Sequence, residues 1–231
     1  MASRRSGGSS SRSSREEGKA LTRQALLRAA LKLLSRNSFD SISLREVTKE
    51  AGISPTAFYR HFDDMEELGL TLVEESFGPL REMLREARSD PAMVTNAIDR
   101  SVETVVLAAE RNQLHFRFIA RERYGGIERI RAAIRRELQL FADELADDLA
   151  VFPFVRDWAP EDRRMLASLI AETMIHMTAE LLDADAAEAE ELVERTRQQL
   201  LLISLGVPVW SVGDRPTLIA ETVRRELDDE G

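Results

Sequence analysis

Apolar residues recur at spacings of three and four along most of this chain. The clearest series follows the glycine pair at positions 125 and 126, where large aliphatic and aromatic side chains fall on one helical face. Its members are Ile127, Ile130, Ile134, Leu138, Phe141, Leu145 and Leu149. A period of about 3.6 residues is typical of an amphipathic α-helix with one face on a core. Because no stretch shows the strict alternation of a strand, the pattern predicts an all-α fold.

Helix start and stop signals divide the N-terminal part into three helices. The apolar period predicts a first helix over about residues 19–36. Ser43 and the glutamate three residues later form a capping box, and Gly52 ends the helix that they begin. Ser54 followed by Pro55 is a second start signal, with proline at the first helical position. Two short helices joined by a glycine-containing turn form a helix-turn-helix, whose second helix enters the DNA major groove.

The rest of the chain is predicted to be a helical body. Helix starts are expected near Asp64, Asp90 and Asn112. The last three helices are expected over about residues 161–182, 186–205 and 216–227. The first residues are rich in serine, glycine and arginine and have too little apolar content to fold. The predicted parts are a flexible basic arm over residues 1–18, a helix-turn-helix domain over 19–64 and a helical domain over 65–231.

Composition narrows the class of protein. With 231 residues, 43% of them apolar, the chain is long enough to bury one large core or two small ones. It has no cysteine, which excludes a disulfide framework and a thiolate metal site. No run of about 18 apolar residues occurs, and the N-terminus lacks the apolar segment of a signal peptide. We therefore expect a cytoplasmic protein with no membrane partner.

Charge is divided unevenly along the chain. Residues 1–62 carry 12 basic and five acidic side chains, a net charge of +7, although the whole chain has a net charge of -9. Residues 63–231 carry the compensating net charge of -16. A basic N-terminal part on an acidic body is the electrostatic pattern expected of a module that docks on phosphates.

The second helix of the motif has an inward and an outward face. On a helical wheel, Phe58 and Phe62 share the face that can meet the preceding helix. Thr56, Tyr59 and Arg60 fall on the opposite face. Hydroxyl and basic groups there are suited to base edges and phosphate oxygens. The predicted DNA-binding residues are Ser43, Arg45, Ser54, Pro55, Thr56, Tyr59, Arg60 and His61.

Three segments of this region resemble the DNA-binding domain of the tetracycline-repressor (TetR) family. They are Ser43-Leu-Arg-Glu-Val47, Ala51-Gly-Ile-Ser54 and Phe58-Tyr-Arg-His-Phe62. The resemblance implies a homodimer that binds a palindromic double-stranded DNA operator. It also implies that residues 65–231 form a ligand-binding and dimerisation domain for a small hydrophobic molecule. One departure is Met65, where many members carry a lysine that contacts phosphate.

The chain is similar to one branch of that family, the FabR-like repressors of unsaturated fatty acid synthesis and the related desaturase regulator DesT. The similar segments are residues 55–70, residues 116–123, and residues 203–206 followed by Trp210. In that branch the effector is a long-chain fatty acyl thioester, usually acyl-CoA. The resemblance therefore implies a regulator of lipid or fatty acid genes. Because some acyl ligands strengthen DNA binding there, whereas ligands release DNA in most of the family, both signs remain possible.

Large apolar side chains of the body are candidates for an acyl-chain site. Methionine and phenylalanine adapt well to hydrophobic pockets. Two arginines one helical turn apart are suited to thioester or nucleotide phosphates. The candidate ligand-binding residues are Phe116, Phe118, Arg117, Arg121, Phe141, Met174 and Met177. The alternatives are core packing for the apolar members and a solvated face for the arginines.

Two predicted helices near the C-terminus carry apolar stripes. The family resemblance implies that such helices form a four-helix bundle across the two-fold axis of the dimer. The candidate interface residues are Leu166, Leu169, Ile170, Leu192, Leu200 and Ile203. Either stripe is equally suited to the body's own core.

Three classes of function follow from these features. The preferred one is a ligand-responsive transcriptional repressor that senses long-chain acyl-CoA. The alternative is a TetR-type repressor of an efflux or catabolic operon that responds to another small hydrophobic ligand. An enzyme is disfavoured, because the sequence has no cysteine, nucleophile elbow, phosphate-binding glycine loop or histidine pair with metal-ligand spacing. We therefore predict no catalytic residue, metal or cofactor.

Overall fold

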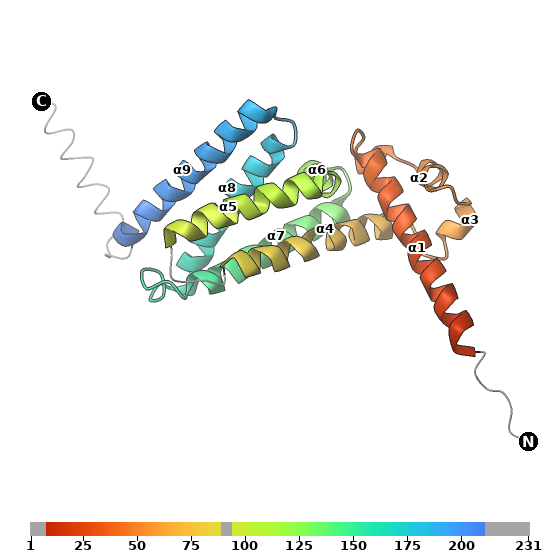
Figure 1. Ribbon diagram of the computed structural model, residues 1–231, viewed down its shortest axis with the longest axis horizontal. Coiled ribbons are helices and arrows are strands. Elements are labelled where there is room, and N and C mark those ends of the chain that lie inside the picture. Colours follow the sequence, from red (N-terminus) through yellow and green to blue (C-terminus); the bar gives the residue numbers. More distant parts are fainter. Residues whose placement is uncertain (1–7, 89–93, 211–231) are drawn as a thin grey trace, which may run out of the picture. The chain divides into compact units, whose positions relative to one another are not determined.

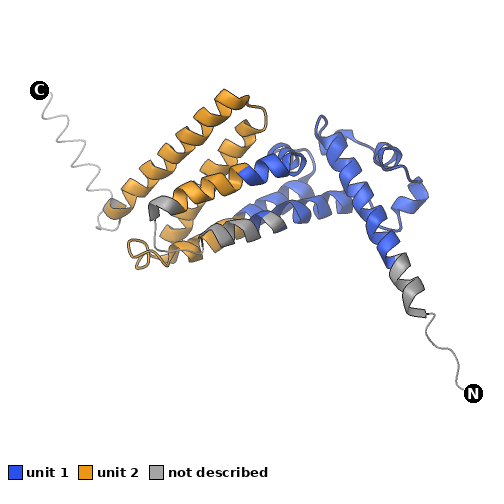
Figure 2. Cartoon of the chain, in the orientation of Figure 1, with its two compact units in different colours: residues 1–82, 107–138 blue, residues 83–106, 139–231 orange. Residues whose placement is uncertain are grey.

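The fold is all-α, which confirms the prediction from the sequence. The computed structural model describes residues 8–88 and 94–210, and these form nine α-helices and one short 3-10 helix without any strand (Figure 1). The chain divides into two compact units, the first made of residues 1–82 and 107–138 and the second of residues 83–106 and 139–231 (Figure 2). The helix expected over residues 216–227 lies outside the described residues.

The helices divide between these two units, and three of them belong to both. The first unit contains α1 (Gly8–Leu34), the 3-10 helix η1 (Phe39–Ser41), α2 (Leu44–Ala51), α3 (Pro55–Phe58) and α6 (Gln113–Glu122). The second unit contains α8 (Pro160–Leu181) and α9 (Ala186–Trp210). Both units include residues of α4 (Met65–Arg88), α5 (Val94–Arg111) and α7 (Glu128–Leu149).

The first helix is longer than predicted. α1 begins at Gly8 and not near residue 19. Residues 8–18 have no apolar stripe of their own that would account for this extension. Once a helix is nucleated, each added residue gains one hydrogen bond, and the packed turns around Leu26 supply the nucleus. The apolar period therefore locates the buried part of α1 but not its first residue.

The start and stop signals of the helix-turn-helix act as predicted. Ser43 Oγ accepts a hydrogen bond from the Glu46 amide at 3.3 Å, and Glu46 Oε2 accepts one from the Ser43 amide at 2.8 Å. Hydrogen bonds from the Ser43 side chain and backbone lower the pKa of the Glu46 carboxyl. Gly52 ends α2 with a φ of 70°, in the left-handed region that favours glycine. At the start of α3, Ser54 Oγ accepts a hydrogen bond from the Ala57 amide at 3.3 Å.

The core of the first unit joins the helix-turn-helix to α4, α6 and α7. Phe58 is 0% exposed, and its ring centroid lies 5.6 Å from that of the buried Phe62. A Cβ atom at Gly69 of α4 would lie 2.5 Å from Ile130 Cδ1 and 2.8 Å from Phe39 Cζ. Such distances exclude a side chain, so glycine at this position lets α7 and η1 pack directly on α4.

The second unit has a separate core. Leu145 and Ala146 of α7 are buried together with Ala167 of α8, and Leu149 and Ile170 pack against them. α8 and α9 also pack against each other. The stripe predicted along α7 thus contributes its C-terminal members to this second core.

Candidate DNA-binding face and ligand cavity

The candidate DNA-binding face lies on the exposed side of the helix-turn-helix. Tyr59 is 61% exposed, and Thr56 and Arg60 are exposed on either side of the buried Phe58. The rings of Phe58 and Tyr59 meet edge to face with centroids 5.6 Å apart. The buried ring therefore helps to orient the exposed one, and the predicted division into inward and outward faces is confirmed.

The remaining predicted residues of this face lie at the starts of the two short helices. Ser43, Arg45, Ser54 and Pro55 are all exposed. The Ser43 hydroxyl also donates to Glu46 Oε2 at 2.7 Å. Both serines are therefore helix caps in addition to lying on this face. Arg45, in the first turn of α2, presents its charge to solvent.

His61 lies among positive charges at the end of this face. Its side chain is half-buried, and the buried Nδ1 atom has no hydrogen-bond partner among the described residues. Burial, and then the positive charges of Lys19, Arg23 and Arg60, lower the pKa of the His61 imidazole. The lowered pKa favours the neutral form of this imidazole in the free protein.

Two of these basic residues were not predicted as part of the site. Lys19 and Arg23 lie one turn apart on α1. The Arg23 guanidinium lies 4.8 Å from the ring centroid of Phe62, and its Nη2 donates to Thr71 Oγ1 at 3.3 Å. The spacing of the two basic residues is visible in the sequence. Their proximity to His61 depends on how α1 packs, which the sequence does not display.

Met65, which departs from the family pattern, lies at the start of α4. Met65 packs against the core of the first unit. Asp64 Oδ1 accepts a hydrogen bond from the Glu67 amide at 2.8 Å, which caps the helix. Methionine at this position thus adds to packing where a lysine would carry charge.

A hydrophobic cavity of about 280 Å³ lies within the second unit. Side chains of α5, α7, α8 and α9 line it, together with the segment between α7 and α8. Leu145 and Met174 are among its aliphatic wall residues, and Phe152 and Phe154 line it from the connecting segment. The polar residues in its wall are Ser101, Asp148 and Ser204. A concave, mostly apolar site with a few polar groups is the usual form of a small-molecule pocket.

The structure does not gather the predicted ligand-binding residues at one site. Met174 lines the cavity, whereas the buried Met177 and the half-buried Phe141 are absent from its wall. Phe116 and Arg117 are half-buried residues of α6 in the first unit. Phe118 is 1% exposed in the core of that unit, with its ring centroid 6.4 Å from that of Phe39. For Phe118 the structure shows core packing.

Arg121 binds backbone carbonyls within the first unit. Its Nη1 atom donates to Leu34 O at 3.2 Å and to Asn37 O at 2.8 Å. The next residue, Glu122, is 1% exposed, and its Oε1 atom accepts a hydrogen bond from the Phe39 amide at 2.9 Å. Burial raises the pKa of the Glu122 carboxyl, and the bond from Phe39 opposes this effect. No local sequence pattern indicates this arrangement.

The predicted interface residues fall into two groups. Leu166, Ile170 and Leu200 line the cavity, and Leu192 is also buried within the chain. Ile203 is half-buried, whereas Leu169 is 50% exposed. Further leucines of α9 that were not predicted are more exposed still, with Leu202 at 71% and Leu205 at 65%. Each apolar stripe is therefore shared between an inward and an outward surface.

Residues 26–71 match the family described as bacterial regulatory proteins, tetR family. This segment contains α2, α3 and the predicted DNA-binding residues. The matched segment is therefore a helix-turn-helix of the TetR type, the DNA-binding domain of bacterial regulatory proteins. The residues that follow this segment are helical over most of the part that the structure describes, up to Trp210.

Several solved structures share this fold. The fatty acid degradation regulator FadR from Bacillus halodurans has a TM-score of 0.66 and 17% identity, covering 78% of this chain and 94% of that chain. FadR from Bacillus subtilis in complex with stearoyl-CoA has a TM-score of 0.64 and 16% identity, covering 78% of this chain and 96% of that chain. A transcriptional regulator from Rhodococcus sp. Rha1 has a TM-score of 0.64 and 21% identity, covering 80% and 96%.

The described part of the chain shows neither a membrane-spanning helix nor a metal-ion cluster. Among residues 8–88 and 94–210, no helix combines the length and apolar character that crossing a bilayer requires. The same residues contain no cluster of three or more side chains suited to hold a metal ion. His176 Nε2 does lie 3.6 Å from Glu180 Oε1, four residues further along α8.

Proposed function

We propose that this chain is a repressor that senses long-chain fatty acyl-CoA and controls lipid or fatty acid genes. The observation that carries the proposal is the apolar cavity of the second unit. The acyl chain occupies this cavity, and the exposed face of the helix-turn-helix binds the operator. The proposal extends the family's DNA-binding role to a defined class of ligand.

The chemistry of the cavity supports an acyl ligand. Four helices contribute to a wall in which aliphatic side chains predominate. Each methylene group that leaves water for such a wall stabilises the complex by about 0.8 kcal/mol. Met174 has a flexible thioether that can adapt to chains of different length. A long alkyl chain therefore gains more from this site than a compact polar molecule does.

Two structural neighbours support the same ligand class. The Bacillus subtilis FadR structure contains stearoyl-CoA, and the Bacillus halodurans FadR is a regulator of fatty acid degradation. Both proteins share the fold at low identity, so their ligands enter here as support for a proposal about this chain.

We further propose that the regulator acts as a homodimer on a palindromic operator. A dimer that holds two recognition helices about 34–36 Å apart can place them in successive major grooves. A ligand that favours one separation then changes DNA affinity by its differential affinity for the two states. The exposed leucines of α8 and α9, Leu169, Leu202 and Leu205, are suited to the dimer interface.

The interface proposal is tested by charge substitution. Leu169→Glu combined with Leu202→Glu should yield monomers that no longer bind operator, as measured by analytical ultracentrifugation and DNA binding. Leu169→Gln with Leu202→Gln is the uncharged control. A dimer that persists in the glutamate variant would place the interface elsewhere.

The ligand proposal is tested by operator affinity at fixed salt. DNA flanking the protein's own gene is titrated with the protein alone, with palmitoyl-CoA, with oleoyl-CoA and with free CoA. We expect a shift of about fivefold or more with acyl-CoA and little with CoA. In Ala97→Phe, the added ring fills the cavity, so operator affinity should persist and the acyl response should disappear. Ala97→Ser is the matched control, and an acyl response unchanged in Ala97→Phe would contradict the proposed site.

A second candidate rests on the aromatic part of the cavity. Phe152 and Phe154 line it from the segment between α7 and α8, and Phe154 remains largely exposed. Such side chains suit an aromatic ligand of an efflux or catabolic regulator. Mass spectrometry of small molecules that copurify with the protein separates the candidates. An acyl species supports lipid sensing, and an aromatic species supports the alternative.

A further inference from the structure

Two adjacent residues at the C-terminal end of α6 hold the connection between α1 and α2. The last carbonyls of a helix lack partners within it. Arg121 donates to the carbonyl of Leu34, the last residue of α1, and to that of Asn37, three residues beyond the helix. Its positive charge also complements the negative end of the α1 dipole. Glu122 adds an acceptor for the Phe39 amide, where η1 begins.

This connection leads directly into the DNA-binding motif. Phe39 is buried against Phe118 of α6 and beside Gly69 of α4. The buried Ile42 follows it, and Ser43, the cap of α2, comes next. A shift of the connection would therefore shift the start of α2 and, through the turn, α3.

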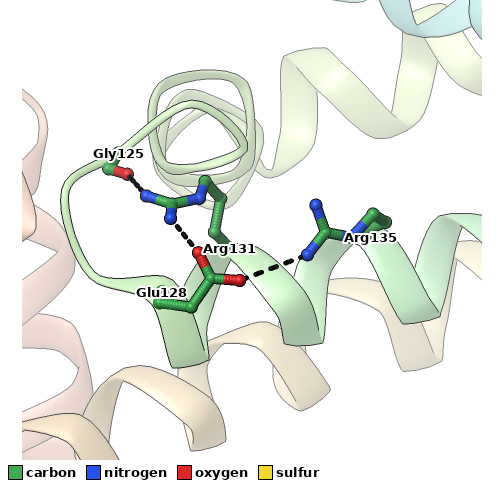
Figure 3. A network of polar contacts seen from close by, with 4 residues as sticks. All are labelled: Gly125, Glu128, Arg131 and Arg135. Atoms are coloured by element: carbon green, nitrogen blue, oxygen red, sulfur yellow. Dashed lines mark hydrogen bonds and ion pairs between the residues drawn. The ribbon is translucent and has the colours of Figure 1, made fainter.

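The turn after α6 gives this pair of residues a fixed support. Arg131 of α7 donates both to Gly125 O and to the carboxylate of Glu128, which also pairs with Arg135 at 3.4 Å (Figure 3). A side chain at Gly125 would overlap the Glu122 carboxylate. The end of α6, the turn and the connection therefore pack without room for another side chain.

We propose that Arg121 and Glu122 are positioning residues for operator binding. They fix the α1–α2 connection and thereby set how α2 and α3 are presented, although neither residue lies on the candidate DNA-binding face. The proposal rests on the operator-binding role of that face. Its consequence is that operator affinity depends on side chains more than 50 residues beyond α3 in the sequence.

The test compares variants that remove or keep each hydrogen-bonding group. Arg121→Met removes the donor and Glu122→Leu removes the acceptor. Arg121→Lys keeps a donor, and Glu122→Gln keeps an acceptor. Arg129→Gln is the control. It breaks the ion pair between Arg129 Nη1 and Glu66 Oε2, which lie 2.9 Å apart in the same unit, and it removes no contact with α1. Operator affinity is measured over a range of salt, well below the melting temperature of each variant. Hydrogen exchange is followed over residues 39–51 of the free protein.

We expect Arg121→Met and Glu122→Leu each to weaken operator binding about tenfold. The salt dependence should stay unchanged, because the number of phosphate contacts does not change. Exchange over residues 39–51 should accelerate, whereas Glu122→Gln and Arg129→Gln should show neither the weaker binding nor the faster exchange. Loss of affinity with a reduced salt slope would overturn the proposal, because Arg121 would then contact phosphate directly.

Unchanged affinity and unchanged exchange in both variants would also overturn the proposal. If the wild-type chain failed to bind operator, the proposed function would be contradicted instead. Hydrogen exchange separates the two failures, because it reports the hold on residues 39–51 without DNA. If Arg121→Met did not fold, Arg121→Lys should show the same changes to a smaller degree, because its ammonium group replaces the planar guanidinium.

Discussion

The helix-turn-helix and the cavity of the second unit use apolar side chains in opposite ways. In the helix-turn-helix, Phe58 and Phe62 are almost completely buried in a packed core beneath the motif, so they fix the face on which the polar side chains lie. In the second unit, side chains such as Leu145 and Met174 leave an apolar space open between them. A filled core stabilises one geometry, whereas an open apolar space can receive a ligand. The helix-turn-helix thus presents a fixed surface, whereas the second unit can adapt to a bound molecule.

The largest effect on stability is expected when one large apolar side chain in each of these two regions is replaced by alanine. Phe58→Ala should destabilise the protein by about 3–5 kcal/mol, since it leaves a void in a filled core. Met174→Ala should cost about 2 kcal/mol, because Met174 already borders an open space. Chemical denaturation followed by circular dichroism measures both. A larger loss for Met174→Ala would break the comparison.

A smaller effect tests how backbone geometry shapes the motif. Gly52→Ala should destabilise the protein by about 1–2 kcal/mol, because alanine resists a positive φ. No described heavy atom lies within 4 Å of the added Cβ, so the cost comes from the backbone alone. Gly18→Ala, within α1, is the control and should stabilise by about 0.5–1 kcal/mol. Equal effects of the two substitutions would contradict this account.

The buried Glu122 predicts a pH-dependent stability. Burial raises its pKa in the folded state, so the native protein binds the proton more tightly than the unfolded chain does. Its contribution to stability is present below the unfolded pKa of about 4.3 and is lost as the pH rises through the folded pKa. Glu122→Gln has no carboxyl group to ionise, so it does not lose this stability as the pH rises. The variant should therefore exceed the wild type in melting temperature by more at about pH 8 than at about pH 5.

Thermal denaturation of both proteins at the two pH values checks this prediction. Glu110→Gln is the control, because that residue is exposed and lies in the same unit. A difference between Glu122→Gln and the wild type that did not change with pH would remove Glu122 as the titrating group.

The smallest expected effect concerns His61. Burial and the nearby charges of Lys19, Arg23 and Arg60 lower its pKa in the free protein, whereas a DNA phosphate would raise it. Binding should then take up a proton, and operator affinity should rise about threefold as the pH falls from about 8 to about 6. His61→Gln should flatten this dependence. The same slope in both proteins, measured by fluorescence anisotropy, would exclude His61 as its source.

Local sequence signals predicted the helix-turn-helix well. The capping box at Ser43, the stop at Gly52 and the start at Ser54 each depend on residues within a few positions of one another. The wheel placed Phe58 inside and Tyr59 outside for the same reason. Local sequence rules are sufficient for this motif because its caps and its turn depend on residues that are close together in the chain.

The cavity and the role of Arg121 required contacts that no local pattern contains. Arg121 binds carbonyls 84 and 87 residues away, and the cavity wall combines side chains from residue 97 to residue 208. The stripe along α8 was visible, but its members separate, with Ile170 on the cavity and Leu169 outside. Periodicity identifies an apolar face without identifying what covers it.

Helix α3, the proposed recognition helix, is only four residues long, and its shortness has an evolutionary consequence. Its shape comes from the cap at Ser54 and from the anchors Phe58 and Phe62, while Thr56 and Arg60 lie outside these constraints. Under the proposed function, substitutions at these two outward positions change the bases that are read without disturbing the fold. A descendant of this regulator can therefore acquire a new operator one side chain at a time.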